Sequence, residues 1–159
     1  MRAAHLGAVA GATALLAGLA AAPAGASTPE SSTLTAPKKT GTVVSQWSGT
    51  IDAPSVGVLV GSDTHALTVT VPGKAAKYFK KREAVLQIEM SWVSTTPLDD
   101  LDLFVYDAAG NEVASSLSGA GTEEVRIPVT GSAVYTVEVD GFINTPGQAY
   151  DAQAFLVVT

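Results

Sequence analysis

Three aspartates stand within four residues at Asp99, Asp100 and Asp102, where water or a cation must offset their mutual repulsion. Calcium binds about six to eight oxygen atoms, which come from carboxylates, carbonyls and water. Asp63 and Asp140 stand near the ends of other expected strands and could supply part of that shell. The spacing therefore suggests a calcium site built from these five carboxylates. In the alternative interpretation, Asp102 hydrogen-bonds a neighbouring loop while Asp99 and Asp100 face water.

Nucleophilic or zinc-dependent catalysis has little support in the residue types. His65 is the one histidine after the N-terminal segment, and the chain has no cysteine, so a zinc site is disfavoured. Ser62, Asp63 and His65 are too close in sequence to converge as a Ser-His-Asp triad does, and no G-x-S-x-G motif is present. We therefore expect no enzymatic activity and place His65 at a surface or sheet edge. A small extracellular hydrolase is the least favoured alternative.

Aromatic residues next to these aspartates suggest a binding surface. Phe104 and Tyr106 share one face of an expected strand with Asp102, and Leu101 and Leu103 occupy the other face. If the aromatic face is exposed, it offers anchors for a protein or polymer. If it is covered, the two rings pack beneath a loop.

A second candidate surface is the segment Lys74–Arg82, which carries five basic residues and has Tyr78 and Phe79 in its middle. It could dock an acidic partner or the cell envelope through charge and aromatic insertion. The alternative is a solvated connection, either a loop or a single helical turn.

Short alternating segments separated by Gly, Pro, Ser and Asn indicate the elements that carry these residues. Trp47 and Trp92 occupy inward positions in two of them and are expected in the core. We predict an all-β fold, an antiparallel β-sandwich that is jelly-roll-like, with about eight or nine strands. The expected strands are Val43–Ile51, Val56–Val60, Thr64–Val71, Val85–Val93, Asp99–Tyr106, Glu112–Ser116, Val125–Val129, Tyr135–Val139 and Ala152–Val158.

The first residues have the pattern of a secretory signal peptide. Met1 and Arg2 precede the apolar run Leu6–Ala22, and Ala24-Gly25-Ala26 fits the small-residue cleavage pattern. We expect residues 1–26 to be removed, residues 27–42 to be a flexible leader, and residues 43–159 to form the sandwich domain. The remaining chain is expected to be secreted, to be extracellular or attached to the cell surface, and to contain no transmembrane segment.

The charge of the chain disfavours nucleic acid as a partner. The full sequence has 9 basic and 15 acidic side chains and a formal net charge of −6. Removal of Arg2 with the signal would make the charge −7, whereas nucleic-acid binding requires a basic stripe. The expected partner is an extracellular protein or polymer.

Two segments resemble the bacterial pre-peptidase C-terminal domain, a β-sandwich family related to the collagen-binding domains of clostridial collagenases. They are LDLFVYDAAGNEVASS at Leu101–Ser116 and AVYTVEVDGF at Ala133–Phe142. The family's Asp-Leu-Asp-Leu-aromatic-Val strand, Asp-x-x-Gly turn and Tyr-x-Val-x-Val-x-Gly strand correspond to Asp100–Val105, Asp107–Gly110 and Tyr135–Gly141. HALTVTVPG also resembles the family's strand before its Pro-Gly turn.

The resemblance implies a non-catalytic module. Domains of this family usually follow secreted peptidases and aid secretion, stability or substrate attachment, and some bind calcium, collagen or other insoluble polymers. This chain departs from the family in two respects. We expect it to be a free-standing copy without a peptidase domain, and Gly61–His65 offers one aspartate where calcium-binding members have an acidic cluster. The expected function is an accessory module for attachment, or for peptidase secretion or stability, with calcium as the candidate stabilising ion. The alternative is a protease-directed partner or inhibitor acting in trans.

Overall fold

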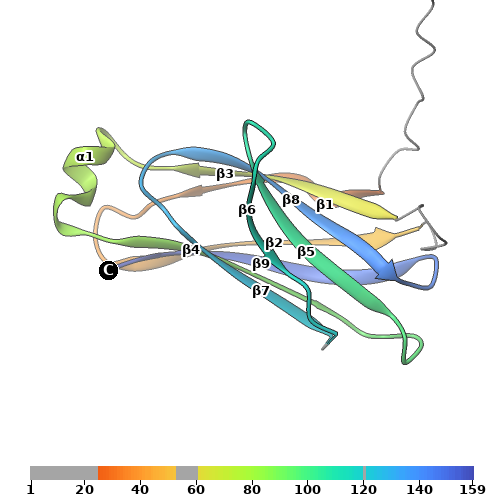
Figure 1. The fold of residues 1–159 in the computed structure, drawn as a ribbon. Coiled ribbons are helices and arrows are strands. Elements are labelled where there is room, and N and C mark those ends of the chain that lie inside the picture. Colours follow the sequence, from red (N-terminus) through yellow and green to blue (C-terminus); the bar gives the residue numbers. More distant parts are fainter. Residues whose placement is uncertain (1–24, 53–60, 120) are drawn as a thin grey trace, which may run out of the picture.

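The computed structural model describes residues 25–52, 61–119 and 121–159. These residues form nine strands and one short helical segment (Figure 1). The strands are β1 Gly25–Thr35, β2 Gly41–Ile51, β3 Ser62–Thr70, β4 Ala84–Trp92, β5 Asp100–Asp107, β6 Glu112–Ser116, β7 Thr122–Pro128, β8 Ala133–Ile143 and β9 Gln148–Val158. The helical segment is α1 Ala75–Tyr78, followed by the 3-10 turn η1 Phe79–Lys81. None of the helices in these ranges is long and apolar enough to cross a membrane.

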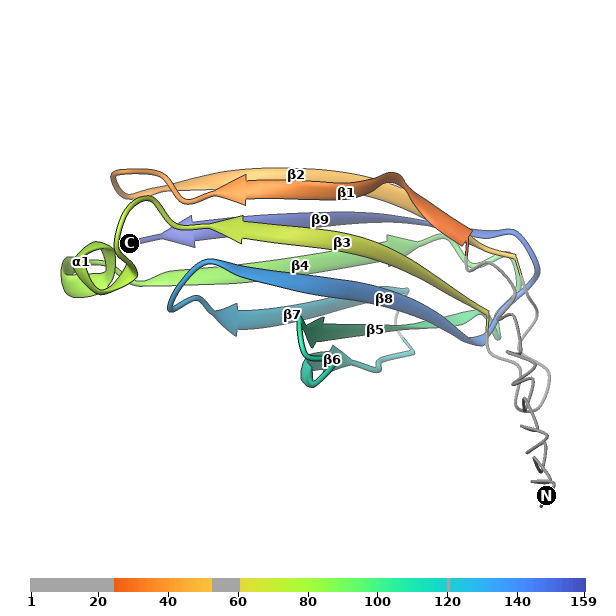
Figure 2. The same cartoon turned by 90° about the horizontal axis from the view of Figure 1, so that it is seen from above.

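The strand order confirms the predicted all-β, jelly-roll-like fold. Strands β2–β9–β4–β7 form one antiparallel sheet, and strands β3–β8–β5–β6 form the other. From β2 to β9 the chain alternates between the sheets, except at the β5–β6 hairpin, which is the jelly-roll order. Strand β1 pairs in parallel with β3 and antiparallel with β2, joining the sheets into one nearly closed structure (Figure 2).

The core lies between the two sheets and comes from the alternation of buried and exposed residues. In β5, Leu101, Leu103 and Val105 are fully buried, so this strand presents its aspartates and aromatic residues outward. Trp47 and Trp92 are 4% and 7% exposed, which confirms the prediction that they belong to the core. Gly110 closes the β5–β6 turn at a φ of 81°, a conformation that favours glycine.

The prediction that residues 27–42 form a flexible leader is wrong for most of that segment, because β1 occupies Gly25–Thr35. Sequence patterning missed this strand because Leu34 is its one large buried apolar residue. The ladder with β3 and hydroxyl contacts to the core hold the strand instead of an apolar face. The expected strand Val56–Val60 lies outside the described residues. The helical turn at Ala75–Tyr78 agrees with one of the two alternatives for its segment.

Candidate functional site

Asp99 connects two loops by hydrogen bonds. Donors occupy both of its carboxylate oxygens, so neither is free for a cation. Its Oδ2 accepts bonds from Thr95 N (2.6 Å), Thr95 Oγ1 (2.7 Å) and Thr96 N (2.7 Å). Its Oδ1 accepts from Thr96 Oγ1, Thr145 N and Thr145 Oγ1, each at 3.1 Å. Burial alone would raise the pKa of Asp99, but these hydrogen bonds outweigh it and hold the pKa well below its usual range. Asp99 therefore ties the β4–β5 loop to the β8–β9 loop.

Asp63 lies inside the sandwich, on the inward face of β3. It is 0% exposed, and its Oδ2 accepts a 2.8 Å hydrogen bond from the Tyr150 hydroxyl. Burial raises the pKa of Asp63, because a charged carboxylate is poorly solvated in the core. A side chain at Gly49 would overlap Asp63 Oδ2 and the Tyr150 ring, so this glycine leaves room for the pair. Asp63 is thus separated from the outward-facing aspartates by the sheet.

Asp102 and Asp140 are neighbours on the outer face of β5 and β8. Burial raises the pKa of Asp102, and the charges of Asp100 and Glu123 add to the effect. Burial raises the pKa of Asp140 to about 7, together with repulsion from Glu138 and Asp102 and a hydrogen bond that the protonated Asp140 carboxyl donates to Glu138. A proton held on Asp140 can therefore offset part of the charge repulsion without a cation.

The structure brings together only part of the set of five carboxylates predicted to bind calcium. Asp102 faces Asp140 across β5 and β8, and Asp100 is close enough for its charge to act on Asp102, whereas Asp63 is in the core and Asp99 is saturated by donors. Within the part of the chain that the structure describes, no group of three or more His, Cys, Asp or Glu residues could hold a metal ion. Strand alternation explains the separation, because successive residues of a strand point to opposite faces of its sheet.

Phe104 and Tyr106 lie on the same outer face as Asp102 and Asp140. Their rings stack with centroids 6.4 Å apart and an interplanar angle of 16°, and both side chains are half-buried. Phe142, two residues beyond Asp140 in β8, is 61% exposed. The backbone ladder places Phe104 beside Glu138. We call this surface the aromatic–acidic face and define it by Asp102, Phe104, Tyr106, Glu138, Asp140 and Phe142.

Tyr78 and Phe79 are largely turned into the molecule, although the sequence suggested that they form a binding surface. Tyr78 is 6% exposed, and its hydroxyl donates a 2.6 Å hydrogen bond to the Pro37 carbonyl. Phe79 is partly buried against the core, and the two rings meet edge to face. These aromatic residues therefore anchor the helical segment, whereas the lysines around them are exposed.

His65 is also in the interior, so its expected surface or edge position is wrong. It is 1% exposed and stacks on Trp47 with ring centroids 4.0 Å apart. Nδ1 lies 3.0 Å from Ser27 Oγ, and Nε2 lies 2.8 Å from Ser32 Oγ. Burial lowers the pKa of His65, which favours the neutral ring. The sequence analysis did not predict these serine–histidine contacts. They lie in the buried interior, where they hold β1 against the core.

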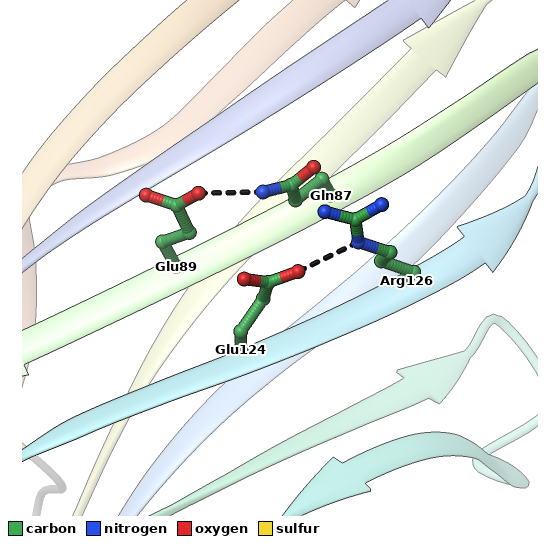
Figure 3. Close-up of polar contacts among 4 residues, drawn as sticks. All are labelled: Gln87, Glu89, Glu124 and Arg126. Carbon is green, nitrogen blue, oxygen red and sulfur yellow. Dashed lines mark hydrogen bonds and ion pairs between the residues drawn. The ribbon is translucent and has the colours of Figure 1, made fainter.

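The outer face of the β2–β9–β4–β7 sheet is a further polar surface. The aligned residues Glu89 and Glu124 are adjacent like charges, a destabilising arrangement in a sheet. Figure 3 shows the compensation: Gln87 donates to Glu89 at 2.5 Å, and Arg126 pairs with Glu124 at 2.6 Å. Hollows of about 740 and 530 Å³ border this face. Sequence analysis missed the surface because its side chains come from strands far apart in the sequence.

Comparison with known proteins gives similarity at the level of structure alone. No protein-family model and no curated protein matches this sequence. One similar solved structure is the pre-peptidase C-terminal domain of a Bacillus anthracis collagenase, with 12% identity, a TM-score of 0.42, and coverage of 82% of this chain and 95% of that chain. It is a domain of the kind that the Leu101–Ser116 motif resembles.

A second similar structure is PliG of Aeromonas hydrophila, a periplasmic inhibitor of g-type lysozyme. It has 12% identity to this chain and a TM-score of 0.39, and the alignment covers 81% of this chain and 97% of that chain. Both similarities are weak and concern the course of the chain, so the functional argument depends on the surfaces described above.

Proposed function

We propose that this chain is a secreted, non-catalytic binding module that attaches to an extracellular protein or polymer through the aromatic–acidic face. The observation that carries the proposal is the stacked Phe104–Tyr106 pair on an outer face that also presents Asp102 and Asp140. Aromatic side chains supply large contact areas at modest entropic cost, which makes them effective anchors. The opposite face of β5 is occupied by the core, so this arrangement leaves the rings available for contact.

The chemistry of this face favours a ligand with cationic groups. An ammonium or guanidinium group can lie over an aromatic ring while a neighbouring carboxylate accepts its hydrogen bonds. Glu138 and Asp140 come from β8 and the rings come from β5, so one ligand could contact both strands. The expected ligand is a protein segment rich in Lys or Arg, or a polymer that carries amines.

The absence of catalysis in this proposal is supported by the position of His65. Among the described residues, the serine–histidine contacts are Ser27–His65 and Ser32–His65. The His65 ring is 1% exposed, so a substrate cannot reach it. Calcium is not required by the proposal, because Asp99 has its oxygens filled by backbone and threonine donors.

Retention on a matched pair of insoluble polymers tests the proposed ligand. Chitosan and chitin differ mainly in whether the amine is free or acetylated, so we expect stronger retention on chitosan. Phe104→Ala with Tyr106→Ala should reduce retention about tenfold or more, since two aromatic anchors are lost. Phe155→Ala is the matched control, because this half-buried ring is on the outer face of the other sheet.

Cellulose, collagen and cell-wall material widen the same assay to ligands without regularly spaced amines. The proposal fails if the Phe155→Ala variant loses as much retention as the double variant. It also fails if the double variant is retained like the unmodified chain on every polymer that binds it. Circular dichroism of each variant separates a lost contact from a lost fold.

A further inference from the structure

We propose a second binding site, at the α1 end of the sandwich, for an anionic extracellular polymer. Seven of the chain's nine lysine and arginine residues lie here, although the chain as a whole has a net charge of −6. We call this cluster the basic end. Its members are Lys38, Lys39, Lys74, Lys77, Lys80, Lys81 and Arg82.

The basic end is assembled from two segments that are distant in the sequence. The Tyr78 hydroxyl donates to the Pro37 carbonyl at 2.6 Å, and Arg82 Nη2 donates to the Lys38 carbonyl at 2.7 Å. The Arg82 guanidinium also lies 5.0 Å from the centre of the Tyr78 ring. These contacts hold the β1–β2 turn against α1 and η1, so lysines more than 30 residues apart in sequence share one end of the molecule (Figure 1).

A hollow of about 350 Å³ lies between the two segments. Its lining includes Lys38, Lys74, Lys77 and Arg82 and contains no carboxylate. A neighbouring hollow of about 370 Å³ is lined by Lys80, Lys81 and Arg82, and also by Phe79, Glu83 and Thr159, so its lining includes a carboxylate. Because Arg82 borders both hollows, the cationic surface continues from one to the other.

The charges of the basic end are not compensated within the fold. Across residues 25–52, 61–119 and 121–159 the salt bridge present is Arg126–Glu124, so the seven cations have no carboxylate partner in those ranges. Lys74, Lys77, Lys80 and Lys81 are exposed. Clustered cations raise the local concentration of anions and release bound counterions when a polyanion binds.

An extended polymer fits this surface better than a membrane does. Two adjoining hollows that share Arg82 suit a polymer with repeated negative charges, which can contact several lysines at once. A lipid surface would be bound more strongly by exposed aromatic side chains. Here Tyr78 is buried and Phe79 packs against the core, so neither of the segment's aromatic residues is available for insertion.

Long-chain inorganic polyphosphate is the probe for this site, with orthophosphate and anionic vesicles as separate arms. We expect the processed, full-length mature chain to bind polyphosphate with an affinity that falls steeply as salt is raised. Lys74→Gln with Lys77→Gln should weaken binding about tenfold. These lysines are exposed, and the variant keeps Tyr78 and Arg82 in place.

The control variant carries Thr50→Glu and Thr122→Glu, which lowers the net charge by the same two units on exposed positions of β2 and β7. The proposal is overturned if this variant loses as much polyphosphate affinity as the double lysine variant. It is also overturned if orthophosphate competes as well as the polymer, or if vesicles containing phosphatidylglycerol bind while polyphosphate does not. The Phe104→Ala, Tyr106→Ala variant should retain polyphosphate binding, so failure here and failure of the aromatic–acidic face are distinguishable.

Discussion

A carboxylate beside another carboxylate in a sheet can be stabilised by a cation or by a proton, and the surroundings of Asp140 favour the proton. Asp140 is half-buried, its protonated carboxyl donates to Glu138 on the same strand, and Asp102 faces it from β5. The negative charges facing Asp140 thus come from both of these strands. Burial and these neighbours raise its pKa to about 7, whereas the pKa of an aspartate in the unfolded chain is about 3.9.

The pH dependence of stability follows from this shift. Between about pH 4 and pH 7 the native state binds more protons at Asp140 than the unfolded state does, so the free energy of unfolding falls as pH rises. We expect a loss of about 2 kcal/mol across this window, allowing for the partial exposure of the group. Asp140→Asn should remove that loss, as measured by urea unfolding at about pH 5 and pH 8.

Calcium and EDTA provide the control for this prediction. If a cation neutralised these aspartates, millimolar calcium would restore the stability lost above neutral pH, because it would bind the native state selectively. We expect no difference between calcium and EDTA in the melting temperature. An unchanged pH profile in Asp140→Asn would contradict the role given to the proton on Asp140.

At the scale of elements, the sequence predicts strands that have one apolar face and misses β1. The alternation in Leu101–Val105 defines the buried face of β5, and the structure places these residues at 0% exposure. In β1, Ser27 and Ser32 turn inward and are satisfied by His65 on β3. A strand whose inward side chains are hydroxyls looks like a polar leader, and its partner histidine is more than 30 residues away.

The candidate sites were predictable to the extent that they lie on one strand. Asp102, Phe104 and Tyr106 follow from period-two alternation, but Glu138 joins them through the register between β5 and β8. The basic end was recognised in part, as Lys74–Arg82. The addition of Lys38 depends on the Arg82 and Tyr78 contacts, which no local pattern indicates.

The role of His65 in holding β1 gives a prediction for that element. His65→Phe keeps an aromatic ring against Trp47 but removes the partner of the Ser32 hydroxyl and the ring contact of Ser27 Oγ, which keeps the Pro29 and Thr64 carbonyls as acceptors. We expect about 1–3 kcal/mol of destabilisation, concentrated in β1, because lost and unsatisfied hydrogen bonds are costly. Hydrogen exchange should show faster exchange of amides in β1 while β9 stays protected.

Ser32→Ala is the milder companion variant, because it removes one hydroxyl and leaves the ring and its Ser27 contact. Its effect on β1 exchange should be smaller and in the same direction. Uniform loss of protection across all strands in both variants would show that His65 supports the whole core equally. Unchanged protection in β1 would show that its ladder with β3 is sufficient.

For the whole molecule, the distribution of charge matters more than its sum. Seven cations gather at the α1 end, while Asp102, Glu138 and Asp140 lie on the outer face of β5 and β8. A chain with this asymmetry can present different signs of charge to different partners. The two proposed sites would then let one small module contact an anionic polymer and a cationic partner through separate surfaces.

Chromatography tests this asymmetry without any assumption about the natural ligand. At neutral pH and low salt we expect residues 27–159 to be retained on both anion and cation exchangers, because a resin responds to the local patch it contacts. Lys74→Gln with Lys77→Gln should abolish retention on the cation exchanger. Thr50→Glu with Thr122→Glu has the same net charge but leaves the basic end intact, so it should still be retained. If both variants elute alike, net charge alone governs the interaction, and the basic end does not act as a separate surface.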